Sequence, residues 1–226
     1  MSFVCAGILQ LPAIKGAKYA ASTSQTNTNL RKIGEASFEL HRLKGHLPPL
    51  GSGDNDGLAV ISPFSFHTSL LPYLDQAASW QSIDKSIPWN AAKNREAFSV
   101  LLPVFCFPVL AETRGPNGYA PAQLVPNIHL VRNGCGISRG DVTDGTSSTI
   151  LAGSIDAAFP AWGDPQNGRD PTNGFAGGPH SFGGGPVGAY MLMIDGSVRT
   201  FGSKTDISVA AALASPSAGD EVPREF

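Results

Sequence analysis

The sequence has few cysteines, and no two of them stand at metal-binding or redox spacing. The three are Cys5, Cys106 and Cys135, and no Cys-x-x-Cys motif occurs, which argues against a zinc knuckle and a thioredoxin-type site. One interpretation is a disulfide between Cys106 and Cys135 in an oxidising compartment. The other is three separate, partly buried thiols, and the spacing alone does not decide between the two.

Charge is also scarce. Charged residues make up 15% of the 226 residues and the formal net charge is -2, so no global field would attract nucleic acid or an anionic membrane. No basic run interleaved with aromatic residues is present, and we predict no nucleic-acid partner. The hydrophobic share of 42% is sufficient for a core, whereas the low charge is unusual for the surface of a cytosolic enzyme.

The N-terminus lacks an apolar run of bilayer-spanning length. Residues 3–14 (FVCAGILQLPAI) are apolar apart from Gln10, but a spanning helix needs about 20 such residues. The stretch also lacks the basic start and the small-residue cleavage site of a secretory signal. Residues 3–14 are therefore consistent with a core helix, an interfacial segment or the remaining half of a membrane helix.

The residues that follow have the pattern of one long helix. Gly45 and the pair Pro48-Pro49 stop its continuation, so we predict a helix over residues 9–44, with a kink at Pro12 as one alternative. The second half is amphipathic and therefore needs a partner surface. Its predicted apolar stripe consists of Leu30, Ile33, Ala36, Ser37, Leu40 and Leu43.

The rest of the chain is rich in glycine (26) and proline (18), which indicates many turns. Residues 101–110 carry two prolines, which predicts a sheet edge or an extended buried loop. Residues 156–188 are predicted to be mostly loop, and a loop of this length usually marks a functional or variable insertion. We predict short helices over 65–78, 91–100 and 207–213, and strands over 123–131 and 149–153.

The clearest local signal lies at residues 189–201. Asp195-Gly196 stands between two strand-like runs, and both residue types adopt positive φ in tight turns. A two-residue turn would place Met193 across from Val198.

These elements predict an α+β fold, in which a long N-terminal helix packs on a small antiparallel sheet with long irregular loops. The predicted division is a helix of residues 1–45 and a globular head of residues 46–226.

Five segments resemble, in the same order, a planctomycete-rich bacterial family known as domain of unknown function 1559, whose members have pilin-type N-termini. The first is residues 9–34, within the predicted helix, and the last is a C-terminal His…Asp-Gly signature. Between them lie LLPYLDQ at 70–76, PWN at 88–90 and DGTSSTI at 144–150. The residues that match the family's signature are Asp144, Gly145, His180, Asp195 and Gly196.

The resemblance implies a pilin-like or pseudopilin-like protein, whose relatives stack their N-terminal helices and display a globular head. We therefore expect a non-enzymatic structural or assembly subunit of the bacterial cell envelope, anchored in the inner membrane with a periplasmic or extracellular head. Its expected partners are further copies or other pilin-like subunits, contacted through the N-terminal helix. Membrane anchoring is expected of a full-length form, and no cofactor is expected.

The sequence departs from the family in several places. The prepilin cleavage site and about half of the membrane helix are absent, which is expected of an N-terminally truncated member with residues 3–14 as a partial membrane segment. Thr26 and residues 105–108 stand where relatives carry cysteines, so a helix-to-sheet disulfide is not expected. Ser154 stands where a glutamate is common, and an insertion at residues 183–186 lengthens the His…Asp-Gly spacing. Within the signature, the histidine is expected to hydrogen-bond the Asp-Gly hairpin and fix the loop before it.

An extracytoplasmic binding module is the alternative function, in which residues 156–188 recognise a glycan, a calcium ion or a protein. Trp162 would be a contact residue in that loop. Its hard oxygen donors form a weak calcium candidate, with Asx turns as the competing interpretation. These donors are Asp164, Asn167, Asp170 and Asn173.

A serine hydrolase is a remote alternative. Residues 136–140 (GISRG) fit the G-x-S-x-G pattern, with Ser138 as nucleophile and His180 downstream. The residues that follow are turn-like rather than helical, so a turn between strands is the favoured interpretation and no catalytic residue is predicted. No histidine pair has zinc-binding spacing, and no metal site of that kind is predicted.

Overall fold

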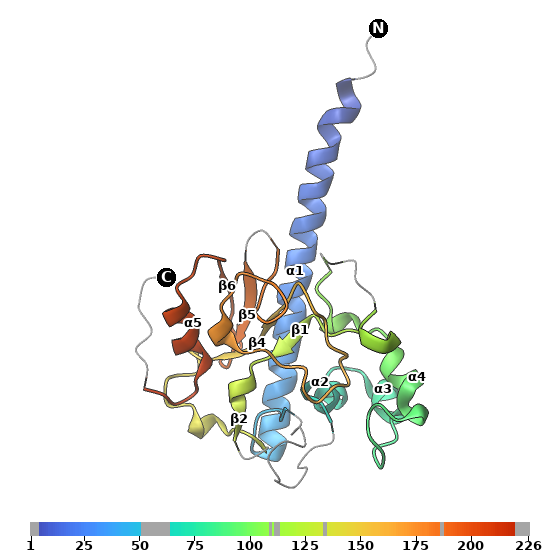
Figure 1. Ribbon diagram of the computed structural model, residues 1–226, viewed down its shortest axis with the longest axis vertical. Coiled ribbons are helices and arrows are strands. Elements are labelled where there is room, and N and C mark those ends of the chain that lie inside the picture. The colour runs from blue at the N-terminus through green and yellow to red at the C-terminus, as the bar shows by residue number, and fades with distance from the viewer. Residues whose placement is uncertain are drawn as a thin grey trace.

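The computed structural model describes residues 5–50, 64–108, 110, 114–132, 135–185 and 188–219, with side chains in the first helix described from residue 16. Within these residues the predicted α+β fold is confirmed: a long N-terminal helix lies against a four-stranded antiparallel sheet, surrounded by short helices and loops (Figure 1).

The first helix, α1, spans Cys5–Lys44 without interruption. Its amphipathic second half is buried in the head, as the periodicity predicts. Leu43 is the exception: it is 52% exposed, because it lies at the rim of the stripe in the last turn of the helix, so its predicted burial was wrong. The stripe residues that are buried are Leu30, Ile33, Ala36, Ser37 and Leu40.

The sheet supplies the surface that covers this stripe. Its strand order is β1-β4-β5-β6, with all neighbours antiparallel, and α1 packs mainly against β5, whose five residues are all buried. A second, two-stranded sheet pairs β2 (Val131–Arg132) with β3 (Cys135–Gly136). The four strands of the main sheet are β1 (Leu124–Pro126), β4 (Ile150–Ser154), β5 (Ala189–Met193) and β6 (Val198–Phe201).

The hairpin between β5 and β6 forms where predicted, but its register differs by one residue. Leu192, not Met193, lies across from Val198. The Gly196 N–H donates to the Met193 carbonyl at 3.0 Å and the Met193 N–H to the Ser197 carbonyl at 2.8 Å, so the turn has three residues and not two. Gly196, at φ +88°, takes the left-handed position of the resulting bulge. Asp-Gly therefore fills the last two positions of a longer turn.

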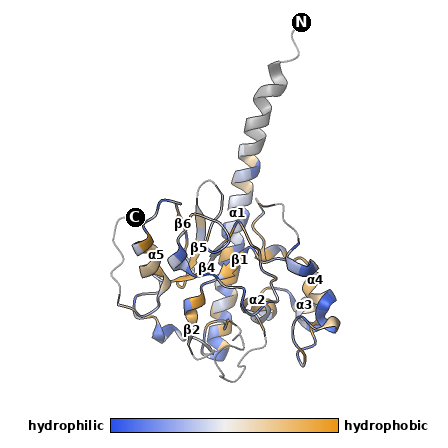
Figure 2. Cartoon of the chain, viewed as in Figure 1, coloured by the Kyte–Doolittle hydropathy of each residue, from blue (hydrophilic) through white to orange (hydrophobic). Residues whose placement is uncertain are grey.

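The short helices lie close to their predicted positions, with one correction. The helix predicted over residues 65–78 is divided, because Pro72 enters a 3₁₀ turn at Leu71–Tyr73 and Asp75 adopts φ +56°. Figure 2 shows α5 as markedly hydrophobic, in accord with the burial of most of its residues. The helices are α2 (Phe66–Leu70), α3 (Ala77–Ser82), α4 (Arg95–Ser99) and α5 (Ile207–Ala214).

Two irregular segments contribute large side chains to the core. Residues 101–108 form an extended loop with one 3₁₀ turn, and Phe105 and Phe107 are fully buried. The long loop from residue 156 onward is irregular, as predicted, apart from a 3₁₀ turn. Trp162 does not serve as an exposed contact residue there: it is 0% exposed and its ring packs 4.6 Å from that of Phe98.

Candidate functional site

The N-terminal half of α1 projects beyond the head (Figure 1). The first contacts with the head are made by Tyr19 and Thr23, whose hydroxyls lie 3.5 Å and 3.1 Å from the Tyr190 hydroxyl. Before them, Gly16, Ala17 and Lys18 are exposed. At the usual helical rise, residues 5–18 extend about 20 Å outward. This projecting helical arm is the most conspicuous feature that a partner could bind.

Farther along α1, hydrogen bonds from Asn29 also hold the helix to the head. The Asn29 side-chain amide is buried and donates to the carbonyls of Pro103 and Cys106, at 2.8 Å and 3.1 Å. Thr26, one turn earlier, is also buried. The resemblance places the cysteines of relatives near Thr26 and in this loop. In this protein, hydrogen bonds from Asn29 to residues 103–106 connect the helix to the loop.

Cys106 is a free thiol, so it does not form the alternative disulfide with Cys135. Its Sγ donates to the Leu102 carbonyl at 3.4 Å. Burial raises the pKa of the thiol to about 11, which leaves little of the nucleophilic thiolate at neutral pH. The structure gives this cysteine no feature of a reactive one.

The two Asp-Gly motifs of the family signature lie side by side and serve as turns. Asp195 accepts from the N–H and hydroxyl of Ser197, at 2.8 Å and 2.6 Å, while its own N–H donates to the Thr146 carbonyl at 2.9 Å. Asp144 accepts from the backbone N–H groups of Ala218 and Gly219, at 2.8 Å and 3.0 Å. Both carboxylates are therefore committed to backbone donors.

His180, the third part of the signature, does not make the predicted bond to the hairpin. It is exposed, and its backbone carbonyl accepts from the Asn173 side chain at 3.2 Å. The signature aspartate, Asp195, is instead fixed from Thr146 and Ser197. The loop is closed without the histidine ring: the Gly183 N–H donates to the Ser154 carbonyl, and the Gly178 N–H to Asp156, at 2.9 Å and 3.0 Å.

Ser138 starts a short 3₁₀ turn, Arg139–Asp141, and not a helix after a strand. Its hydroxyl and the Asp141 carboxylate form a reciprocal capping box, with the Ser138 N–H donating to Asp141 Oδ2 at 2.8 Å. Gly136 is needed for another reason: a Cβ there would lie 1.8 Å from the Leu47 carbonyl oxygen. The G-x-S-x-G residues thus serve a close backbone approach and a cap, consistent with the favoured interpretation as a turn.

The calcium candidates are each engaged locally. Asp164 accepts from the Gln166 N–H at 2.9 Å, an Asx turn. Asp170 accepts from Thr172 and pairs with His129 Nε2 at 2.8 Å. The Asn173 amide donates to the His180 carbonyl. Among the described residues, no group of three or more His, Cys, Asp or Glu side chains is placed to hold a metal ion.

The fourth candidate, Asn167, belongs to a buried polar cluster that the sequence did not indicate. Its amide nitrogen lies 2.8 Å from His67 Nδ1 and 3.0 Å from the Trp162 carbonyl. His67 Nε2 donates to the Leu124 carbonyl at 2.7 Å, which fixes the neutral tautomer with Nδ1 as the acceptor. Burial lowers the pKa of His67 to about 4. The cluster joins α2, β1 and the long loop, and no local pattern signals it.

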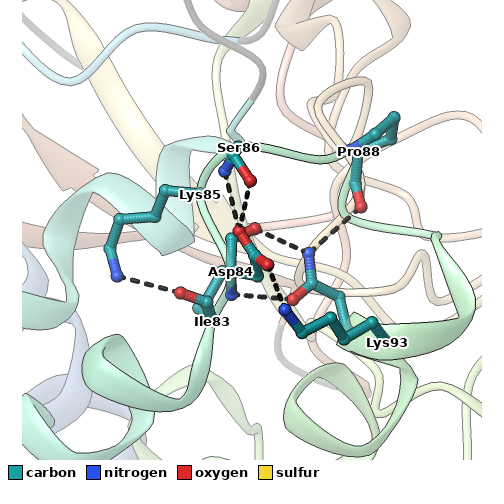
Figure 3. Close-up of polar contacts among 7 residues, drawn as sticks. Ile83, Asp84, Lys85, Ser86, Pro88 and Lys93 are labelled. Atoms are coloured by element: carbon teal, nitrogen blue, oxygen red, sulfur yellow. Dashed lines mark hydrogen bonds and ion pairs between the residues drawn. The ribbon is translucent and has the colours of Figure 1, made fainter.

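Pro88, the first residue of the family segment PWN, contributes its carbonyl to the hydrogen-bonded turn shown in Figure 3. The buried Asn94 side chain accepts from the Asp84 N–H at 2.8 Å and donates to the Asp84 and Pro88 carbonyls at 2.9 Å and 3.1 Å. Asp84 in turn accepts from Ser86 and from Lys93 Nζ (Figure 3), and these bonds hold the pKa of its carboxyl well below the usual range. The side chains of Asp84 and Asn94 thus make their hydrogen bonds within the turn, which gives them a structural role.

Among the described residues of the head, depressions of the surface lie at the long loop and beside α1. One has a volume of about 660 Å³, is open, and lies between the long loop and residues 114–116. The other, of about 250 Å³, is smaller, mainly apolar and lies beside α1. The first is lined by Arg114, Gly115, Pro116, Ala158, Phe159, Pro160 and Asp164. The second is lined by Gln25, Leu101, Pro103, Cys106, Pro108, Leu110 and Gln123.

Within the part of the chain that the structure describes, no helix combines the length and hydropathy needed to cross a membrane. Comparison with curated proteins and with solved structures gave no match. The family described as Protein of unknown function (DUF1559) matches residues 16–123, from the exposed part of α1 to the residue before β1. Over these residues the match confirms the family resemblance that the ordered segments indicated.

Proposed function

We propose that this protein is a non-enzymatic, pilin-like structural or assembly subunit of the bacterial cell envelope. The observation that carries the proposal is the division of α1 into a half built into the core and a half that projects beyond the head (Figure 1). Residues 5–14 are free of charge in the sequence. An apolar helix end held away from its own core needs another apolar surface to cover it.

The proposed partners are further copies or other pilin-like subunits, with membrane association of the helix end in a full-length form. The proposed location is the inner membrane, with the head on the periplasmic or extracellular side. The low charge of the sequence is compatible with a protein that packs side by side with others.

The test is self-association of the full chain, measured by sedimentation velocity over a range of concentrations. We expect concentration-dependent oligomers, and we expect the double variant Ile8→Glu, Leu11→Glu to remain monomeric, because two carboxylates would have to be buried in the contact. Ile207→Glu, at a residue 58% exposed on α5, is the control and should associate like the parent. A parent chain that stays monomeric at every concentration would contradict the proposal.

The open depression favours a second candidate, the extracytoplasmic binding module, because three consecutive residues of the long loop line it: Ala158, Phe159 and Pro160. Thermal unfolding with calcium chloride and with a panel of soluble glycans would test this function. A rise in melting temperature that disappears in Phe159→Ser would support it. No shift with any ligand would remove this candidate.

The proposal that the protein has no catalytic activity has its own check at Ser138. Its place in the capping box supports a structural role. We expect a fluorophosphonate probe to leave the folded protein unlabelled, and labelling that is lost in Ser138→Ala would overturn this view.

A further inference from the structure

The smaller depression is an apolar groove in the flank of the head, which we call the flank groove. It is lined by Leu101, Pro103, Cys106, Pro108 and Leu110, together with Gln123 and, on α1, Gln25. The adjoining turn, Pro103–Phe105, packs directly against α1, so the groove lies alongside the helix. Among its lining residues none carries a charge, and the side chains that line it are mainly apolar.

The groove is exposed although it is hydrophobic. Leu101 is 36% exposed and its neighbour Val100 is 48% exposed, two of the few large hydrophobic side chains of the described residues that remain accessible. Pro103 and Pro108 are also exposed. The fully buried neighbours Phe105 and Phe107 hold this segment rigidly in the core, so the groove is a preformed apolar surface and not a frayed loop.

The shape of the surroundings favours a helix as the occupant. On α1, Lys18 and Ala21 precede Gln25 by seven and four residues, and both are exposed. At this spacing the three residues share one face of the helix, which extends from the groove toward the N-terminus. A second helix laid parallel to α1 would contact this face and the groove together. Ala21 is small enough to let the two backbones approach closely.

The protein's own chain supplies such a helix, but only from another copy. Residues 5–14 are helical and without charge, which matches an uncharged groove. They precede Gln25 by 11 to 20 residues on one continuous helix, or about 16–30 Å along its axis. Because α1 does not turn back, this segment cannot reach the groove of its own head.

We propose that the flank groove receives residues 5–14 of a second copy, which lies parallel to α1 and displaced along its axis. The proposal rests on the proposed function as an assembly subunit, and it adds that the head, and not only the neighbouring helices, covers the projecting segment. Each copy would then present one groove and one helix end. The contact between them is head-to-tail, so it can repeat from copy to copy.

Photo-crosslinking tests the contact directly. Leu101→p-benzoylphenylalanine in the full chain should, on irradiation, capture a peptide from residues 1–18 of another copy. A mixture of isotopically labelled and unlabelled chains shows by mass spectrometry that the product joins two copies. The same photo-reactive residue at Ile207, which is exposed on α5, is the control. Capture of head residues only, or equal capture of the helix from Ile207, would overturn the proposal.

A charge in the groove separates this inference from the proposed function. Leu101→Glu should weaken self-association at least tenfold with little change in melting temperature, because the side chain is already partly exposed. If Ile8→Glu, Leu11→Glu abolishes association while Leu101→Glu leaves it intact, the helix end assembles subunits but the groove is not its binding site. A parent chain that never associates would overturn both.

Discussion

At the scale of single residues, His67 is the least expected feature of the core. It is 0% exposed, and it forms T-shaped ring contacts with Phe66 and Phe105, with centroid distances of 5.5 Å and 4.5 Å. Both ring nitrogens are used by uncharged partners, Leu124 and Asn167. A proton on Nδ1 would therefore break the bond from Asn167 and place a charge in an apolar site.

This environment makes stability depend on pH in a defined window. The unfolded chain protonates this histidine near pH 6.5, whereas the folded protein resists protonation until about pH 4. Between these values the unfolded state binds more protons, so stability is complete above the window and is lost as the pH falls. We expect the free energy of unfolding to drop by about 2–3 kcal/mol between pH 7.5 and 4.5 through this residue. Urea unfolding at a series of pH values measures it.

Two variants identify the source of this loss. His67→Phe should be less stable than the parent at neutral pH, since the Leu124 carbonyl and the Asn167 amide lose their partner, but its stability should decline less on acidification. His180→Gln, at an exposed histidine, should retain the full decline. An unchanged pH dependence in His67→Phe would show that other groups cause it.

At the scale of elements, α1 shows how far helical periodicity predicts burial. The stripe is correct from Leu30 to Leu40 because the sheet and residues 103–105 cover that stretch. It is wrong at Leu43, where the pattern continues but the covering surface does not. Periodicity identifies the face of a helix, and the neighbouring elements determine how much of that face is buried.

Alanine variants at the two ends of this stripe should therefore differ sharply. Leu30→Ala removes a side chain that is 0% exposed and should lower the free energy of unfolding by about 2–5 kcal/mol, from lost burial and a cavity. Leu43→Ala should change it by less than about 0.5 kcal/mol. Urea denaturation of both variants provides the comparison, and similar losses would mean that Leu43 is covered in solution, for instance by another copy.

At the scale of the whole molecule, the features that the sequence predicted are local ones. Pro48-Pro49 prevents the first helix from continuing and Asp195-Gly196 marks the hairpin turn, and each of these effects acts within a few residues. The unpredicted features join distant segments: His67 to Asn167, and the Leu47 carbonyl to Gly136. A loop rich in glycine and proline carries no periodicity, so the burial of Trp162 within it could not be inferred.

Residues 216–219 are attached to the rest of the molecule by a distant contact of this kind, at Asp144. Asp144 accepts from the amides of Ala218 and Gly219, more than 70 residues away, and its own N–H donates to the Pro216 carbonyl. We expect Asp144→Ala to accelerate hydrogen exchange at these two amides about tenfold or more, since each loses a charge-assisted hydrogen bond. Asp195→Ala is the control, and NMR-detected exchange that does not change in Asp144→Ala would contradict this role.

The continuity of α1 also determines how the protein would carry a mechanical load. A pull on the projecting end travels along one unbroken helix into the head, where Leu30, Ile33 and Leu40 are packed against the sheet. Because the pull runs along the helix axis, these contacts must slide together and cannot be peeled apart in sequence. The force at which the head yields should therefore be set by the packing of the buried half of α1, and the hairpin of β5 and β6 should remain intact until that helix is withdrawn.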